Sequence, residues 1–389
     1  MHIELPEIIV DADHVTLRAR VRLQERGTVV PEHLWFRYAR QHESLVSREI
    51  APFVVALSSL ASVFREPIEV EGSICERLRV GLEEYWTIFN RWLPDTYSPV
   101  LVACNGPVED VQASHACQAG HACGTAFSGG VDSFFTLYRH LQDRERYPSH
   151  VVRYALFVHG FDIPLTDERS YRTSFEAYEP VLAGHGVTLV GVTTNLREFV
   201  GRADWNMSHG SALCGTAMTL SPVLRRFFVP SSKSYGTLEP WGSDPVIDAL
   251  LSTDSFQVIH DGAAYTRFEK LQAMQSWKTI RPLLRTCYEA IDGLRNCGRC
   301  RNCRRTMFVL AALGELDKFE TFPPVTSPAQ FRWARWDTPH ERLVAQQSIE
   351  HAAGNGRVSI AMAGRVAMKR SQVLAVKRRL MELWRRPAR

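Results

Sequence analysis

A short segment rich in serine and glycine most constrains how this chain can fold. It reads A-F-S-G-G-V-D-S over residues 126–133, and Phe134, Phe135 and Leu137 follow it at helical spacing. We expect a strand, a phosphate-binding loop and a helix, because glycines admit an oxyanion close to the backbone and the positive end of a helix points at the loop. The lysine and the longer spacing of a P-loop are absent. An ordinary turn between a strand and a helix is the simpler alternative.

Strands and helices alternate after residue 125, which predicts a parallel sheet with helical crossovers. The expected strands after the loop are residues 151–158, 187–192 and 227–229, and the expected helices are 170–184 and 211–220. Ligands bind beyond the carboxyl ends of strands in such sheets. The polar residues expected near those ends, or before the second helix, are His159, His209, Ser231, Ser232 and Lys233.

The residues before the loop predict a small α+β domain over 1–102, followed by a linker over 103–124. Residues 13–23 alternate between apolar and polar side chains, which favours a strand, with a turn at 25–27 and a second strand at 34–38. Residues 73–93 predict a helix that begins with a capping box of Ser73 and Glu76. The linker lacks periodicity, and its H-A-C repeats at 115–117 and 121–123 are poorly spaced for zinc.

Four cysteines at close spacing form the strongest single motif of the chain. Their pattern is C-x9-C-x2-C-x2-C, formed by Cys287, Cys297, Cys300 and Cys303. Two overlapping C-x-x-C pairs with a fourth thiolate upstream suit tetrahedral zinc, and a site closed by four sulfurs has a structural role. Arginines at 295, 299, 301, 304 and 305 would offset the charge of the thiolates. An iron–sulfur cluster and four unligated cysteines are the alternatives.

Composition favours a multidomain cytoplasmic protein. The chain has 389 residues, of which 45% are hydrophobic, and its nine cysteines are an odd number that suits reduced thiols. No uncharged apolar run approaches the length of a membrane span, and the N-terminus lacks the basic and apolar regions of a signal peptide. We therefore expect neither a membrane segment nor secretion.

The positive charge of the chain is concentrated at its C-terminus. Residues 357–389 contain ten Lys/Arg and one acidic residue, so the remaining 356 residues carry 36 basic and 41 acidic side chains. Residues 366–386 predict a basic amphipathic helix with Val373, Val376, Leu380 and Trp384 on one face. Docking of that face on the protein itself is the simplest interpretation, and an acidic protein partner or RNA is the alternative.

The serine–glycine loop resembles the PP-loop of ATP pyrophosphatases. Together with C-x9-C-G-R-C-x2-C some 150 residues later, it is similar to the 7-cyano-7-deazaguanine synthase (QueC) family over residues 124–323. The resemblance implies an adenine nucleotide α-hydrolase-like, Rossmann-type α/β domain over 125–325 that includes the zinc segment, with residues 326–389 as a C-terminal extension. It implies ATP, catalytic Mg²⁺ and structural Zn²⁺ as cofactors.

The resemblance also assigns roles to residues. The expected ATP-binding residues are Ala126, Ser128, Gly129, Gly130, Val131, Asp132, Ser133 and His159. Asp132 would hold the metal or the loop, and Arg267 and Lys270 of the segment T-R-F-E-K would stabilise the phosphates, unless either is an ordinary cation on an exposed helix face. His209 would accept the proton of an attacking amine. Ser231, Ser232 and Lys233 would bind substrate, and either Asp244 or Asp248 would hold the guanidine-like edge of a deazaguanine.

The extra N-terminal and C-terminal regions make the chain similar to extended QueC-like proteins of bacterial antiviral defence operons. That resemblance implies a carbon–nitrogen ligase that adenylates the carboxylate of 7-carboxy-7-deazaguanine and joins it to the N-terminal amine of a partner protein. The alternatives are a nitrile synthase that uses ammonia, a PP-loop enzyme that modifies tRNA, and a nucleotide-binding scaffold without activity.

Overall fold

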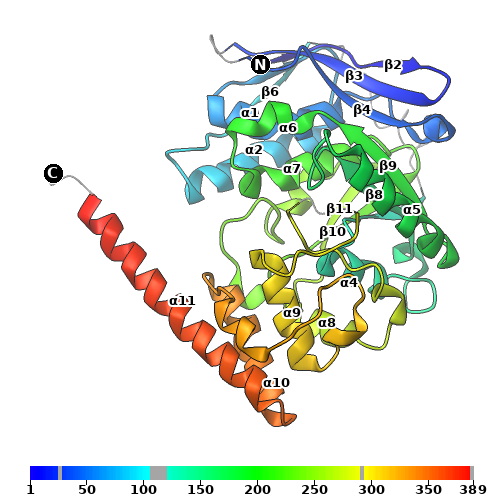
Figure 1. Ribbon diagram of the computed structural model, residues 1–389. Helices are drawn as coiled ribbons and strands as arrows, with labels where there is room; N and C mark the ends of the chain where they lie inside the picture. The colour runs from blue at the N-terminus through cyan, green and yellow to red at the C-terminus, as the bar shows by residue number, and fades with distance from the viewer. Residues whose placement is uncertain (25–28, 106–120, 290–292, 386–389) are drawn as a thin grey trace. The chain divides into compact units, whose positions relative to one another are not determined.

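The computed structural model describes residues 1–24, 29–105, 121–289 and 293–385, and the chain forms two compact units (Figure 1). The first unit comprises Met1–Ser128, Thr136–Ser231 and Glu239–Gly262. The second unit comprises Gly129–Phe135, Ser232–Leu238 and Ala263–Arg389. The predicted turn at 25–27 and the H-A-C repeat at 115–117 lie outside the described residues.

The first unit contains a large, mostly parallel sheet. Five parallel strands form one half of it in the order β11-β10-β7-β8-β9. They are β7 (Ala122–Ala126), β8 (Val152–His159), β9 (Thr188–Thr194), β10 (Leu224–Pro230) and β11 (Gln257–Asp261). Numbered along the chain, the order is 5-4-1-2-3, so the first strand lies at the point where the order reverses. The predicted strands of this region are confirmed, but β7 begins inside the expected linker, and β11 had no counterpart in the prediction.

The other half of the sheet is built from the first 104 residues. Its strands are β1 (His2–Ile3), β2 (Glu7–Val10), β3 (His14–Arg22), β4 (His33–Ala39), β5 (Ile68–Val70) and β6 (Val102–Cys104). The two predicted strands of this region are confirmed as β3 and β4. Strand β4 pairs antiparallel with β9, with Phe36 opposite Thr194. The compact units therefore divide differently from the expected boundary at residue 102, because this pairing joins both halves into one sheet and one core.

Helices of the first unit bury apolar side chains in its interior. They are α1 (Ala51–Phe64), α2 (Glu76–Trp92), α5 (Glu168–Gly184), α6 (Leu196–Phe199) and α7 (Trp205–Met218). The aromatic face predicted for α2 is buried, but its capping box is wrong: the helix starts at Glu76, Cys75 precedes it, and no side chain caps it. Helix α7 starts six residues earlier than predicted, because Asp204 caps it by accepting the N–H of Asn206.

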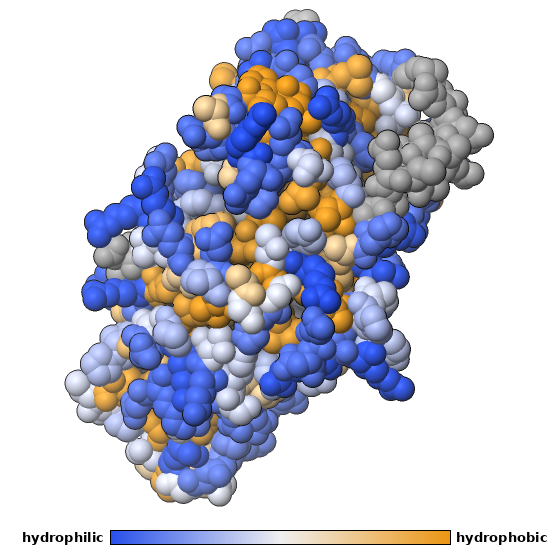
Figure 2. Space-filling model, turned by 90° about the vertical axis from the view of Figure 1, so that its right-hand side faces the viewer, coloured by the Kyte–Doolittle hydropathy of each residue, from blue (hydrophilic) through white to orange (hydrophobic). Residues whose placement is uncertain are grey.

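The second unit is helical in its described part. It contains α8 (Arg267–Met274), α9 (Arg301–Leu313), α10 (Pro339–Gly354) and α11 (Val358–Arg385). Helix α4 (Val131–Arg139) begins in this unit and ends in the first. Among the described residues, no helix combines the length and the apolar content that a membrane crossing requires. On the face drawn in Figure 2, hydrophobic residues are interspersed with hydrophilic ones.

Candidate functional site

The serine–glycine loop leads from β7 into α4, as predicted. Phe127 still donates its N–H to the carbonyl of Leu156 at 2.9 Å, as a continuation of the sheet. Gly129 then adopts a φ of +73°, which glycine reaches without steric cost, and α4 starts two residues later at Val131. The carbonyl of Gly129 accepts the N–H of Arg285 at 2.8 Å. This bond ties the loop to the chain just before Cys287, within the second unit.

Asp132 holds two cations in the first turn of α4. Its Oδ2 lies 2.7 Å from Arg267 Nη2, and its Oδ1 lies 2.8 Å from Lys270 Nζ. Lys270 is only 1% exposed, so the alternative that it is an ordinary cation on an exposed helix face is wrong. Burial raises the pKa of Asp132, but the charges of Lys270 and Arg267 outweigh burial and lower it to about 2.

A capping box at the start of α8 orients both cations. Thr266 Oγ1 accepts the N–H of Glu269 at 3.3 Å, and Glu269 Oε2 accepts the N–H of Thr266 at 2.7 Å. Gln347 of α10 fixes both partners, because its amide bonds Thr266 Oγ1 at 2.7 Å and Glu269 Oε1 at 3.2 Å. Arg267 and Lys270 are three residues apart, so they project from the same side of α8 toward Asp132. The T-x-x-E signal for this cap is present in the sequence.

The low pKa of Asp132 predicts how stability depends on pH. An aspartate that is ionised in the folded state stabilises it above its unfolded pKa of about 3.9, and the contribution is lost as the pH falls toward 2. This difference between the unfolded and the folded pKa of Asp132 contributes about 2 kcal/mol to the free energy of unfolding. We expect the free energy of unfolding of the wild type to exceed that of Asp132→Asn at pH 6 and this excess to shrink by about that amount at pH 2.5, in urea titrations. An excess that does not change with pH would contradict the ion pairs.

His340 is a neighbour of this cluster that sequence reasoning missed. It follows the cap and the proline at the start of α10, and its Nδ1 lies 2.9 Å from Thr237 Oγ1 and 3.4 Å from the N–H of Ser234. Burial and then the positive charge of Arg267 lower its pKa to about 4. Because the amide of Ser234 can only donate, Nδ1 is an acceptor and the proton of the neutral ring lies on Nε2. No described residue bonds that Nε2.

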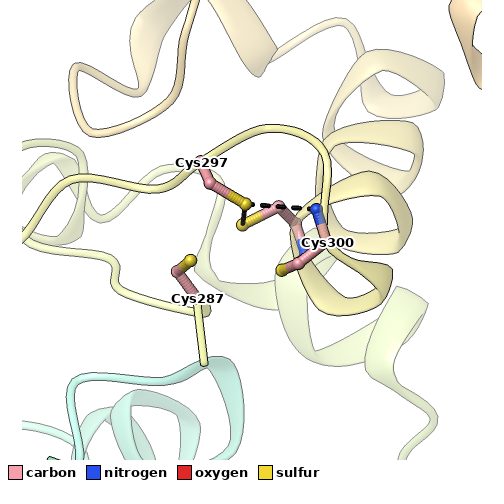
Figure 3. A group of neighbouring side chains, drawn as sticks. Cys287, Cys297 and Cys300 are labelled. Carbon is pink, nitrogen blue, oxygen red and sulfur yellow. Dashed lines mark hydrogen bonds between the residues drawn. The ribbon is translucent and has the colours of Figure 1, made fainter. Parts of the chain in front are cut away.

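The four predicted cysteines meet in one cluster of the second unit (Figure 3). Their sulfur atoms all lie within 4.8 Å of one another, and those of Cys297 and Cys303 are 3.8 Å apart. A tetrahedron with Zn–S bonds of about 2.3 Å has sulfur–sulfur edges of about 3.8 Å, whereas a disulfide needs about 2.05 Å. The cluster is therefore compatible with a structural metal such as zinc, and none of its cysteines is in a disulfide.

Backbone amides support the sulfurs from one side. Cys297 Sγ accepts the N–H groups of Arg299 and Cys300 at 3.4 and 3.1 Å, and Cys300 Sγ accepts that of Cys303 at 3.4 Å. Gly298, at a φ of +69°, makes the tight turn that brings these amides to the sulfur. Donated N–H groups favour the charged thiolate, which is the form that binds metal.

Neighbouring side chains fix the segment around the cysteines. Asn296 is buried beside Cys297, donates from Nδ2 to the carbonyl of Leu284 at 2.8 Å and accepts the N–H of Thr286 at 2.8 Å. Two of the arginines expected to offset the thiolate charge pair with a carboxylate instead. Arg301 and Arg305 pair with Glu341 at 2.7 and 2.6 Å, because α10 places this carboxylate beside α9.

Two predicted histidines lie in the first unit with different surroundings. His159, at the end of β8, is buried and has its Nε2 3.0 Å from the carbonyl of Pro164, so this proposed ATP-binding residue already has a structural bond. His209 lies inside α7 rather than before it, and its Nδ1 is 3.2 and 3.1 Å from the carbonyls of Trp205 and Asn206. Carbonyls only accept, so the proton is on Nδ1, and Nε2 keeps the lone pair that a base needs. Burial lowers the pKa of His209.

Both aspartates that were expected to compete for a substrate are buried in the first unit. Asp248 is fully buried, and its carboxylate bonds Ser243 Oγ and His260 Nδ1 at 2.7 Å each and the N–H of Asp244 at 3.2 Å. These three hydrogen bonds hold the Asp248 carboxylate within the first unit. Asp244 accepts the N–H of Val246 at 2.9 Å and is also buried. Which of the two would contact a substrate stays a prediction.

The remaining predicted substrate residues follow β10. Ser231 belongs to the first unit and donates its N–H to the carbonyl of Asp261 at 2.7 Å. Ser232 and Lys233 are half-buried in the second unit. Within the first unit, the Asp261 carboxylate also forms hydrogen bonds with the side chains of Thr136, Arg139 and His140, at 2.8, 2.7 and 3.0 Å. The unpredicted strand β11 thereby anchors the end of α4.

Comparison of this chain with protein-family models, with curated proteins and with solved structures gave no match.

Proposed function

We propose that this chain is an ATP-dependent ligase of the PP-loop type, which adenylates a small carboxylate of the deazaguanine class and joins it to an amine. The observation that carries the proposal is the pair of cations that Asp132 holds beside the S-G-G-V-D-S loop. The unit that contains Gly129–Phe135 of the loop and both cations also contains the four-cysteine cluster. The reversal of strand order at β7 supports the proposal, because nucleotides bind at such points of open α/β sheets.

The proposed reaction has two steps. An oxygen of the substrate carboxylate attacks the α-phosphorus of ATP, and the bond from that phosphorus to the departing pyrophosphate breaks. The nitrogen of the amine then attacks the acyl carbon and loses its proton to a base, and AMP leaves with the electron pair of the C–O bond. Negative charge builds on the phosphates in the first step, and cations held in place stabilise it without reorganisation.

Residues of the second unit would supply this stabilisation. Gly130, Val131 and Ser133 lie at the start of α4, where the positive end of the helix dipole favours phosphate oxygens. Arg267 and Lys270 would meet the α-phosphate or the pyrophosphate. Mg²⁺ would add charge neutralisation on the outer phosphates. Both oxygens of Asp132 are engaged with cations, so we assign Asp132 to positioning Arg267 and Lys270 rather than to the metal.

A product assay tests the proposal. With ATP and 7-carboxy-7-deazaguanine, we expect AMP and pyrophosphate in equal amounts, measured by chromatography, and none with 7-deazaguanine, which lacks the carboxyl group. The proposal would be overturned if the products were ADP and phosphate, or if ATP were hydrolysed at the same rate with and without the carboxylate substrate. Mass spectrometry of the acyl product then identifies the acceptor: free nitrile with ammonium indicates the synthase, and a mass added to the N-terminus of a co-expressed partner indicates the protein ligase.

A further inference from the structure

Helix α11 carries two separate apolar faces. The inner face is packed within the second unit against α9, α10 and the 3₁₀ segment Pro328–Trp333. Its buried residues are Ile360, Ala361, Ala363, Gly364, Ala367 and Ser371. Gly364 is required there because a Cβ would collide with the ring of Phe308, and Ser371 Oγ accepts the N–H of Trp336 at 3.0 Å. The helix is thus docked, but not by the face predicted from the sequence.

The outer face remains exposed along the helix. Met362, Val366, Val373 and Val376 are between 47% and 58% exposed. With Lys369 they follow the spacing 4-3-4-3, which is that of the a and d positions of a coiled coil: a is Val366 and Val373, and d is Met362, Lys369 and Val376. We call these five residues the outer seam. Valine at a is typical of two-stranded coiled coils.

The described side chains of α11 beyond Ser371 lie outside the core. After Ser371, none of the described side chains at 372–377 and 381 is buried. An isolated helix of this length is marginal in water, and an apolar stripe of this length on a surface marks an interaction site. Figure 1 draws this helix in red.

The charges beside the outer seam indicate what packs there. The e and g positions that flank it include Arg365, Arg370 and Lys377, and residues 358–381 contain no acidic side chain. A second copy of α11 would place these cations opposite one another, which disfavours self-pairing. RNA would leave the apolar seam without a partner, and a membrane would receive the ammonium group of Lys369 in the middle of its apolar contact. Glutamates of a partner helix would satisfy both the flanks and Lys369.

We propose that the outer seam of α11 binds an acidic amphipathic helix of another protein as a two-stranded coiled coil. Valine and methionine side chains of the seam pack against apolar a and d residues of the partner, and glutamates at its e and g positions pair with Arg365 and Lys377. This inference goes beyond the proposed ligase activity and does not depend on it.

Two matched synthetic helices test the surface with the full-length protein. Both carry valine and leucine at a and d, but one has glutamate and the other lysine at e and g. By fluorescence anisotropy at physiological salt, we expect the glutamate peptide to bind at least about tenfold more tightly, which corresponds to 1.4 kcal/mol or more. Equal affinities, or binding of neither peptide, would overturn the proposal.

Variants separate the outer seam from the rest of the helix. Val376→Glu should abolish binding of the glutamate peptide, whereas Leu374→Glu, which adds the same single charge to the same helix off the seam, should retain it. In Arg365→Glu/Lys377→Glu, the lysine peptide should bind more tightly than the glutamate peptide. The proposal fails if sedimentation shows a dimer of the protein that the seam variant dissociates. It also fails if binding to vesicles of phosphatidylserine and phosphatidylcholine depends on the seam and binding to the peptide does not.

Discussion

Replacing Cys303 with serine is expected to abolish zinc binding by the four-cysteine cluster, for which the cluster is suited, and to lower the stability of the second unit more than any other single change. Cys303 Sγ is buried 3.8 Å from Cys297 Sγ, and a hydroxyl at this position is a poor ligand for zinc. Structural zinc in small domains contributes about 10–16 kcal/mol of apparent binding free energy, so even a partial loss is large. A loss of about 5 kcal/mol would lower the melting temperature of such a unit by roughly 10–20 °C.

Elemental analysis and calorimetry check this prediction. We expect about one zinc ion per wild-type chain, almost none in Cys303→Ser, and a matching fall in melting temperature when the wild type is treated with a chelator. Cys104→Ser is the control, because Cys104 lies in β6 of the first unit, outside the cluster. Iron with visible absorbance would favour the iron–sulfur alternative. If the wild-type protein contains no metal and its melting temperature does not change with the chelator, the cluster has no structural role as a metal site.

Replacing Asp132 with alanine is expected to abolish release of pyrophosphate and to destabilise the second unit. Without the Asp132 carboxylate, the buried Lys270 would lose this ion pair, and breaking a buried ion pair costs about 3–5 kcal/mol. Arg267 and Lys270 would also lose the partner that positions them. A loss of at least about 100-fold in rate is the scale expected when groups that stabilise transition-state charge are misplaced.

A second substitution separates the two effects. Adding Lys270→Met to Asp132→Ala removes the buried charge, so stability should recover while pyrophosphate release stays lost. Urea titration measures the first quantity and a coupled pyrophosphate assay the second. Asp143→Ala, at an exposed aspartate just beyond α4, should change neither. Asp132→Ala protein that releases pyrophosphate at the wild-type rate would show that the ion pairs serve folding alone.

Local signals predicted the elements well and their ends less well. The strands β3, β4, β8, β9 and β10 and the helices α2, α5 and α7 were expected from periodicity. The beginning of α7 was misplaced because the glycine of His209–Gly210 suggested a boundary, whereas the structure uses this glycine for close approach to the backbone of Gly242. The T-x-x-E signal of Thr266 and Glu269 is present in the sequence and forms the capping box of α8.

The sequence by itself determined features that depend on neighbours along the chain: the loop that turns at Gly129 into α4, the knuckle of Cys297 and Cys300, and the period of each strand. Only the tertiary structure decided which distant groups meet. It joined β4 to β9, placed Arg267 and Lys270 on Asp132 across more than 130 residues, brought His340 to Ser234, and turned the valines of α11 outward. The physical reason is that dihedral preferences and periodicity act over a few residues, whereas burial and charge pairing depend on the packing of the whole fold.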